Sequence, residues 1–435
     1  MTITKEPVKR GDILKNIILK SDDITDFQIE KALKESVSNL NKKIKKVLLL
    51  PPDFTRFHSE AGKITQMYYD ILNKTCHVDI MPAIGTHMPM TNIEIEKMYG
   101  KCIPRDRFIV HDWRNDIVKI GEVPSSFVKE VSEGLLDFSI DVEVNHRLIS
   151  REYDLIISIG QVVPHEVVGM ANYNKNIFVG CGGKHMINSS HFLGAVYGLE
   201  RIMGKDHSPV RKVYDYAEEN FFANVPLMYV LTVISQEQGE NQLSGLFIGR
   251  EREVFEEAVK LSQEKNIVFL KKPLKKVVVY LDPEEFKSTW VGNKAIYRSR
   301  MAIEDNGHLI IIAPGAKQFG EDKGIDSLIR KYGYVGRDKI LSLTHDNNDL
   351  QNNLSAAAHL IHGSSDGRFK ITYATDKLSK AEVEGVGFEY MPLEDALNKY
   401  DISKFKDGFN ALETGEEIFY ISNPALGLWA YESKF

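Results

Sequence analysis

Short apolar runs alternate with amphipathic stretches along most of the chain, a pattern typical of the alternating strands and helices of an α/β fold. In the first part of the chain we expect buried strands at residues 46–50, 78–85, 153–160 and 174–180. Each of these runs leads directly into polar sequence that contains Gly or Pro. Ligands of open α/β sheets collect at the carboxyl ends of strands, so these loops are where we look for a site.

The alternation continues with a helical pattern at 210–225, a strand-like run at 225–236 and a charged amphipathic helix at 250–266. A charged segment broken by a proline, "FLKKPLKK" (269–276), is the best domain boundary, and the alternation restarts after it. We therefore predict an α/β fold with mostly parallel sheets in two domains, residues 1–270 and 275–414. The final segment, 415–435, contains a strand-like run that could return to the first domain.

Composition narrows the class of protein. The 435 residues are 43% hydrophobic and 27% charged, which is typical of a globular protein. A net charge of −6 and a pI near 6.1 give no general attraction to nucleic acid or anionic membranes. We see no signal peptide and no apolar run of about 18 residues, and three widely spaced cysteines suggest a reducing compartment. We expect a cytoplasmic protein.

The loop "PPDFTRFH" follows the first buried strand and carries Asp53, Thr55 and Arg56. An arginine at such a place can hold a carboxylate or phosphate through two parallel hydrogen bonds. Asp and Thr are also ordinary N-caps, so an Asp–Arg pair that caps the next helix is the alternative.

Two further strand ends carry a histidine beside a proline. His87 lies in "AIGTHMPMT" and His165 in "SIGQVVPHEVVGM", and we expect both in exposed loops. Histidine is well suited to proton transfer near neutral pH, although a lone histidine is more often structural or solvated. A pair placed on opposite faces of a substrate is what a racemase needs, and the spacing leaves open whether these two face each other.

The stretch "VGCGGKHMINSSH" (179–191) places reactive side chains behind a double glycine. They are Cys181, Lys184, His185 and His191, which follow or flank Gly182 and Gly183. Such side chains bind metals or form covalent adducts, and the alternative is a turn into a helix with solvated histidines. The stretch is neither a P-loop nor a dinucleotide-binding motif, and the chain contains no C-x-x-C or H-E-x-x-H zinc motif.

In the second domain, "WVGNKAIYRSR" places Trp290 and Lys294 at the start of a helix. A lysine is electrostatically unfavourable near a helix N-terminus, which makes a ligand-binding role for Lys294 more attractive, and a solvated lysine is the alternative.

As an ordered set, D-x-T-R, G-T-H, "VVPHEVVG" and a Gly-Gly turn with lysine resemble the nickel-dependent lactate racemase family. The resemblance covers residues 45–195 well and the second domain loosely. It implies two α/β domains with the active site in the cleft between them. It also implies a nickel pincer nucleotide that is joined to a lysine, with a histidine that completes the coordination of the nickel. The cofactor takes a hydride from the α-carbon of a 2-hydroxy acid and returns it to either face.

The resemblance assigns site residues in this sequence. His87 and His165 match the two catalytic histidines, which act alternately as base and acid on the substrate hydroxyl. Cofactor binding falls to Asp53, Thr55, Arg56, Gly182, Gly183, Lys184 and His185, and metal binding to His191 or His185. Lys294 matches a lysine that holds the substrate carboxylate, and Trp290 and Asn293 lie beside it.

The sequence departs from the family pattern at the Gly-Gly turn. The family has G-G-x-K, a Pro-Gly loop and a nickel histidine well downstream. Here Lys184 falls one position early, the Pro-Gly loop is missing, and His191 arrives about nine residues sooner. Either Lys184 still reaches the cofactor or the covalent attachment is lost. Val291 stands where the family has a glutamine, which points to a substrate other than lactate.

Three hypotheses remain open. The first is a racemase or epimerase of a 2-hydroxy acid with this cofactor. The second is a non-catalytic or non-covalent ligand-binding protein of the same fold. The third is a metal-dependent lyase or hydrolase built on His165, His185 and His191. For the first we expect as partners a small 2-hydroxy acid and the enzymes that make the cofactor, allow for a homo-oligomer, and expect neither nucleic acid nor membrane.

Overall fold

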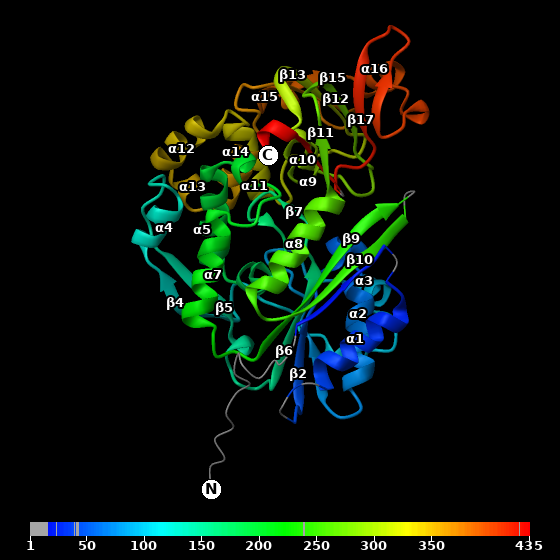
Figure 1. Cartoon of the computed structure of the whole chain (residues 1–435). Coiled ribbons are helices and arrows are strands. Elements are labelled where there is room, and N and C mark those ends of the chain that lie inside the picture. Colours follow the sequence, from blue (N-terminus) through cyan, green and yellow to red (C-terminus); the bar gives the residue numbers. More distant parts are fainter. Residues whose placement is uncertain (1–15, 23, 39, 41–42, 238–239, 426) are drawn as a thin grey trace. The chain divides into compact units, whose positions relative to one another are not determined.

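The computed structural model describes residues 16–435 except 23, 39, 41, 42, 238, 239 and 426 (Figure 1). These residues form two compact units, each built on a six-stranded sheet. The first unit holds the described residues up to Ser190 together with Gly204–Lys265, and the second holds His191–Met203 and Asn266–Phe435. Strands alternate with helices in both, and most neighbouring strands in the two large sheets are parallel, so the predicted fold class is confirmed.

The sheet of the first unit has the order β1-β10-β9-β6-β2-β3. Its strands are β1 (Ile17–Lys20), β10 (Glu240–Gly249), β9 (Leu227–Glu237), β6 (Leu155–Gln161), β2 (Lys46–Leu50) and β3 (His77–Ile80). β9, β6, β2 and β3 are parallel, and β10 is antiparallel to both of its neighbours. The near-continuous apolar runs of β2 and β6 fit strands buried on both faces at the centre of the parallel part.

Helices and two hairpins complete the first unit. The helices are α1 (Asp26–Ser38), α2 (Ala61–Leu72), α3 (Asn92–Tyr99), α4 (Ser125–Val131), α7 (Pro209–Phe221) and α8 (Arg252–Asn266). The hairpins are β4 (Ile117–Val123) with β5 (Ile140–Asn145), and the short β7 (Pro164–His165) with β8 (Gly169–Met170). Apolar residues of α1 and α2 form one core with those of β2, β3 and β6. The helix α5 (Lys184–Tyr197) begins in the first unit and ends in the second.

The sheet of the second unit has the order β15-β14-β13-β12-β17-β16. These strands are β15 (Glu389–Met391), β14 (Lys370–Ala374), β13 (Ile303–Ile312), β12 (Leu274–Tyr280), β17 (Glu417–Ile421) and β16 (Gly408–Ala411), and only β16 runs antiparallel to its neighbour among these described pairs. A separate parallel pair joins β11 (Ile267–Leu270) to β18 (Leu428–Tyr431). The helices are α6 (Leu199–Ile202), α9 (Thr289–Gly292), α10 (Lys294–Ser299), α11 (Lys323–Tyr332), α12 (Arg337–Asp346), α13 (Asn348–Gln351), α14 (Leu354–His362), α15 (Lys380–Gly385) and α16 (Leu393–Lys399).

One expectation about an element was wrong. Residues 174–180 form no strand but end in a single π-helical turn, Asn176–Gly180, because Asn176 bonds to two neighbouring strands and Phe178 is buried among aromatic rings. In the segment 415–435, β17 pairs with β12 and β18 pairs with β11, whose residues end the predicted first domain, so the segment does not extend the large sheet of the first unit. In the described part of the chain, none of the helices combines the length and the apolar character that crossing a membrane requires.

Candidate functional site

Asp53 lies just past the carboxyl end of β2 and makes two kinds of contact. It caps the short 3-10 turn Phe54–Ser59, because its Oδ1 accepts the backbone N–H of Thr55 at 3.1 Å and the hydroxyl of Thr55. Its other oxygen, Oδ2, lies 2.5 Å from Nδ1 of His87. Asp53 therefore caps this 3-10 turn with one oxygen and contacts the histidine with the other.

The charge of Asp53 fixes which nitrogen of His87 carries a proton. Burial raises the pKa of Asp53, but hydrogen bonds from His87 and Thr55 and the positive charge of Arg56 outweigh it, so the pKa is lowered overall. An ionised carboxylate only accepts hydrogen bonds, so Nδ1 of His87 donates and neutral His87 presents a lone pair at Nε2. The side chain of His87 is 59% exposed, as expected for a loop.

His165 has the opposite arrangement. Its Nδ1 accepts the backbone N–H of Val167 at 3.1 Å, so the neutral ring carries its proton on Nε2. His165 is buried in the β7–β8 hairpin rather than exposed in a loop. A carboxylate oxygen of Glu166 lies 3.9 Å from the same Nδ1.

Lys175 is a candidate site residue that the sequence analysis did not name. It is half-buried, and loss of solvation lowers its pKa to about 8, helped by the positive charges of Arg56 and Arg211 and opposed by Glu166 and Asp53. The amine therefore shares its surroundings with the Asp53 loop and with the residue next to His165. A lysine with this pKa is partly neutral near pH 7–8 and can act as a nucleophile.

Asn176 holds Lys175 at the end of the sheet. Its Nδ2 donates to the carbonyl oxygen of Leu50 and to Oγ of Ser158, both at 3.0 Å. These acceptors belong to β2 and β6, so Lys175, like Asp53, lies toward the carboxyl ends of the parallel strands. A glycine in β6 makes room for the loop, because a Cβ on Gly160 would lie 1.9 Å from Nδ2 of Asn172.

The predicted cofactor residues Gly182, Gly183, Lys184 and His185 pack instead on the β4–β5 hairpin. The backbone N–H of His185 donates to Glu143 at 2.9 Å, and Nδ1 of His185 accepts the N–H of Asp141 at 3.1 Å. Both glycines are closely packed here, since a Cβ on Gly182 would lie 1.9 Å from the carbonyl oxygen of Phe178 and one on Gly183 would lie 2.4 Å from the Glu143 carboxylate. Lys184 is exposed at the first residue of α5. The contacts of His185 are thus with β5, whereas Lys175 lies with the Asp53 loop.

The two remaining reactive residues of that stretch differ in surroundings. Cys181 is fully buried, and burial raises the pKa of its thiol, which makes it unreactive. His191 is half-buried in the part of α5 that belongs to the second unit.

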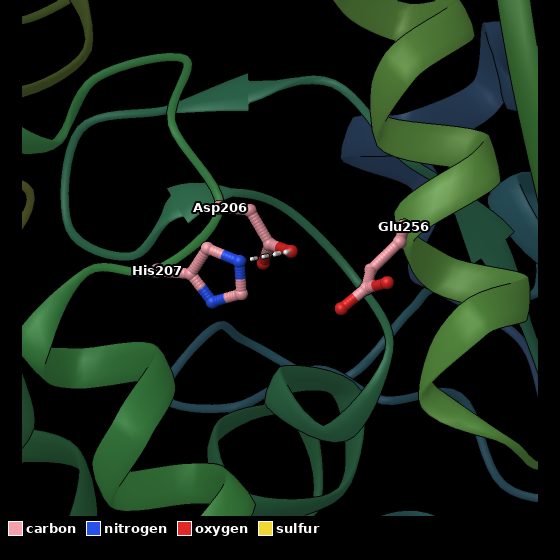
Figure 2. Close-up of side chains that lie close together, drawn as sticks. All are labelled: Asp206, His207 and Glu256. Atoms are coloured by element: carbon pink, nitrogen blue, oxygen red, sulfur yellow. Dashed lines mark ion pairs between the residues drawn. The ribbon is translucent and has the colours of Figure 1, made fainter.

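Asp206, His207 and Glu256 form the one group in the described residues whose carboxylate and imidazole atoms are close enough to hold a metal ion, within 4.8 Å of one another (Figure 2). Arg252 already compensates these carboxylates, with Nη2 at 2.7 Å from Asp206 and Nε at 3.9 Å from Glu256. We interpret the group as an ion-pair cluster. In the part of the chain that the structure describes, His165, His185 and His191 do not form such a group.

In the second unit, Trp290 stacks on a histidine that the sequence analysis did not place in a site. The Trp290 and His359 rings lie 4.2 Å apart at 27°. His359 is buried, and its two ring nitrogens lie 2.9 Å from the hydroxyl groups of Tyr297 and Tyr334. This chain of hydrogen bonds fixes the surface on which Trp290 rests.

Asn293 and Lys294 lie at the junction of α9 and α10. Asn293 is fully buried and its Oδ1 accepts the hydroxyl of Tyr373 at 2.7 Å. Lys294 begins α10, is half-buried, and has its Nζ 5.8 Å from the ring centre of Phe286. The substrate-binding roles of Trp290, Asn293 and Lys294 stay a prediction.

The chain is similar to known proteins over most of its length. Residues 9–198 match the lactate racemase N-terminal domain. Lactate racemase from Thermoanaerobacterium thermosaccharolyticum is 22% identical over 346 residues, which are 74% of this chain and 75% of that protein.

Two solved structures share the fold. A crystal structure of a protein from Thermotoga maritima superposes with a TM-score of 0.79 at 26% identity, over 95% of this chain and all of that one. The lactate racemase apoprotein from Thermoanaerobacterium thermosaccharolyticum gives a TM-score of 0.69 at 18% identity, over 96% and 95% of the two chains. Residues 9–198 therefore match a lactate racemase N-terminal domain, and most of the chain shares the fold of the lactate racemase apoprotein.

Proposed function

We propose that the chain is a racemase or epimerase of a lactate-type 2-hydroxy acid, with His87 and His165 as the acid and base. The observation that carries this proposal is the opposite protonation of the two rings. Asp53 leaves a lone pair on Nε2 of neutral His87, whereas Val167 leaves a proton on Nε2 of neutral His165. A racemase needs one group that takes the hydroxyl proton and another that returns one.

The first unit fits the family's nickel pincer nucleotide. Lys175 offers a partly neutral amine for a covalent bond, with its pKa at about 8. Gln161, at the carboxyl end of β6, has a buried Oε1 without a hydrogen-bond partner among the described residues. When bound, the cofactor supplies the acceptor for a hydride from the α-carbon of the substrate.

We assign the attachment to Lys175 rather than Lys184. The pattern G-G-x-K fits Asn172-Tyr173-Asn174-Lys175 in backbone conformation, because Asn172 and Tyr173 have φ of 63° and 59°, the left-handed region that favours glycine. His191 follows Lys175 by 16 residues, which removes the shortfall that arises when the motif is placed at Lys184. His191 is then the nickel ligand, and imidazole suits nickel.

The chain's own residues carry the proton steps. Nε2 of His87 takes the hydroxyl proton of one enantiomer, and the ionised Asp53 stabilises the imidazolium that forms. His165, protonated to the imidazolium, gives its Nε2 proton to the oxygen when the other enantiomer is made and is left as the neutral ring. In the reverse direction the two histidines exchange roles. Lys294, with Trp290 and Asn293, binds the substrate carboxylate in this proposal, and Val291 favours a larger hydroxy acid than lactate.

The test is intact-mass and metal analysis of the chain produced together with the cofactor-making enzymes, followed by assay of racemisation. We expect an adduct that maps to Lys175, about one nickel per chain and interconversion of the enantiomers of a 2-hydroxy acid. Lys175→Met should lose the adduct, whereas the matched control Lys184→Met should keep it. A folded chain with neither adduct nor nickel would support the non-catalytic ligand-binding protein instead.

A further inference from the structure

The turn before Lys175 has a backbone conformation that its residues disfavour. Asn172 and Tyr173 are consecutive and both left-handed, with φ of 63° and 59°. This region is unfavourable for L-residues other than glycine, least so for asparagine and strongly so for a bulky side chain. Such a turn persists only when the surrounding structure holds it.

Arg211 of α7 holds this turn from inside the protein. It is fully buried, and its Nη2 donates to the carbonyl oxygens of Met170 at 2.7 Å and Asn172 at 3.2 Å. Its Nη1 donates to Oδ1 of Asn174. One guanidinium therefore ties together three residues of the segment that leads to Lys175.

Asp215, one helical turn further along α7, holds the other end of the same amide. Its Oδ1 accepts Nδ2 of Asn174 at 2.6 Å. The Asn174 side chain is thus fixed between a cation and an anion of one helix, which determines the orientation of the residue directly before Lys175.

Tyr173 is fixed by packing. Its ring lies 4.8 Å from Phe255 at 12° and 4.3 Å from Tyr229, and its hydroxyl donates to the carbonyl oxygen of Arg250 at 3.2 Å. The side chain of the strained Tyr173 is therefore fixed by its neighbours, and Asn174 connects the turn to α7.

We propose that Arg211 and Asp215 are positioning residues, which clamp Asn174, keep the left-handed turn closed and so fix the Lys175 amine at the carboxyl ends of β2 and β6. The proposal rests on the proposed function for the use of Lys175, but the clamp is a property of the cofactor-free chain. Release of the turn would return the amine to water.

The groups around Lys175 determine in which direction its pKa moves when the turn is released. Arg56, from the turn after β2, and Arg211, from α7, lower the pKa of Lys175, while Glu166 and Asp53 raise it. Loss of solvation is the largest cause of the low pKa. Movement of the amine into water therefore raises its pKa toward the ordinary value of 10.5.

The experiment is competitive acetylation of the full, cofactor-free chain across a pH series, with the modification of Lys175 read by peptide mass spectrometry. Three variants separate position from charge. Asn174→Ala changes no charge, Arg211→Lys keeps the charge but loses the planar fork, and Asp215→Ala removes an anion, which by itself lowers the pKa of a nearby lysine. The matched control is Asp326→Ala, because Asp326 holds backbone N–H groups and Arg330 in the second unit.

We expect the midpoint of Lys175 labelling to lie near pH 8 in the parent chain and to rise by about one unit or more in all three variants. The control should leave it unchanged. The clamp is overturned if the midpoint is unchanged in folded Asn174→Ala and Asp215→Ala, or if it falls in Asp215→Ala. These two variants decide the question even where Arg211→Lys does not fold. A midpoint near 8 in a chain that never takes up nickel refutes only the racemase. An adduct at Lys175 with unmoved midpoints refutes only the clamp.

Discussion

At the scale of single residues, the protein sets the protonation of both candidate histidines through their Nδ1 atoms. His87 donates from Nδ1 to a carboxylate and His165 accepts at Nδ1 from a backbone N–H. The two rings are therefore prepared for different first steps.

Asp53→Asn should separate orientation from charge at His87. The amide keeps the size of the side chain but does not stabilise the imidazolium, and it allows the wrong tautomer of His87. We expect kcat of the cofactor-loaded enzyme to fall roughly 10²- to 10⁴-fold with little change in KM. Thr55→Val, which removes a partner of the other carboxylate oxygen, is the control and should change kcat far less. Equal losses in the two variants would argue against the proposed base.

The lowered pKa of Asp53 also predicts how stability depends on pH. A carboxylate with a depressed folded-state pKa stabilises the fold above its ordinary pKa of 3.8, and this contribution is lost as the pH falls through the folded value. The difference in free energy of unfolding between the parent chain and Asp53→Asn should shrink as the pH falls from about 5 through the folded-state pKa of Asp53. Urea denaturation at each pH below about 5 measures it, and a difference that grows over this range contradicts the assignment.

The three cysteines should differ in reactivity. Cys102 is exposed, Cys76 is half-buried and Cys181 is buried with a raised thiol pKa. A maleimide added to the folded chain should label Cys102 fastest and leave Cys181 unmodified until the protein unfolds. Peptide mass spectrometry after a time series checks this order. Labelling of Cys181 in the folded chain would show that the turn at Gly182–Gly183 opens.

At the scale of elements, the sequence predicts best what local pattern determines. The apolar runs of β2 and β6 and the D-x-T-R loop were recognisable, because burial on both faces and a capping Asp leave strong local signals. The π-helical turn at Asn176–Gly180 was not, because a short apolar run reads the same in a strand and in a buried turn. Lys175 was missed for a related reason, since Asn172 and Tyr173 take the glycine-like conformation without being glycine.

Gly160→Ala tests how closely β6 and the Lys175 loop pack. The added Cβ would lie 1.9 Å from Nδ2 of Asn172, so the loop must move. We expect a loss of about 1–3 kcal/mol in the free energy of unfolding and weaker cofactor retention. Gly385→Ala is the matched control, because a Cβ there meets nothing within 4 Å at the end of α15. A neutral Gly160→Ala would mean that the loop is not packed on β6.

At the scale of the whole molecule, the chain crosses between its two units three times. It enters the second unit within α5, returns at Gly204, and enters again at Asn266. A linear reading of the sequence suggests only the last crossing, because a continuous helix shows no boundary in its pattern. The candidate nickel ligand His191 is the first residue of the short segment that belongs to the second unit, so its placement depends on how firmly that segment is bound there.

Glu200 is the residue that anchors this segment. Its Oε1 accepts Nε of the buried Arg300 at 2.9 Å and Nη1 of Arg368. Glu200→Gln removes the charge and leaves Arg300 bonded to backbone carbonyls and Asp366. We expect this variant to lower the free energy of unfolding by about 1–3 kcal/mol. Asp305→Asn is the matched control, because Asp305 pairs with the same Arg368 at 2.9 Å but is 70% exposed, so this variant should lower the free energy of unfolding far less.

Hydrogen exchange measured by mass spectrometry shows which part of the chain loses stability in Glu200→Gln. If the two units unfold separately, Glu200→Gln accelerates exchange in β13 and β14 and leaves β2 and β6 unchanged. Nickel retention should then fall with the stability of the second unit, although the variant leaves the Asp53 loop and Lys175 intact. Equal acceleration in both sheets would show instead that the two units unfold as one, and that α5 couples the nickel ligand to the whole chain.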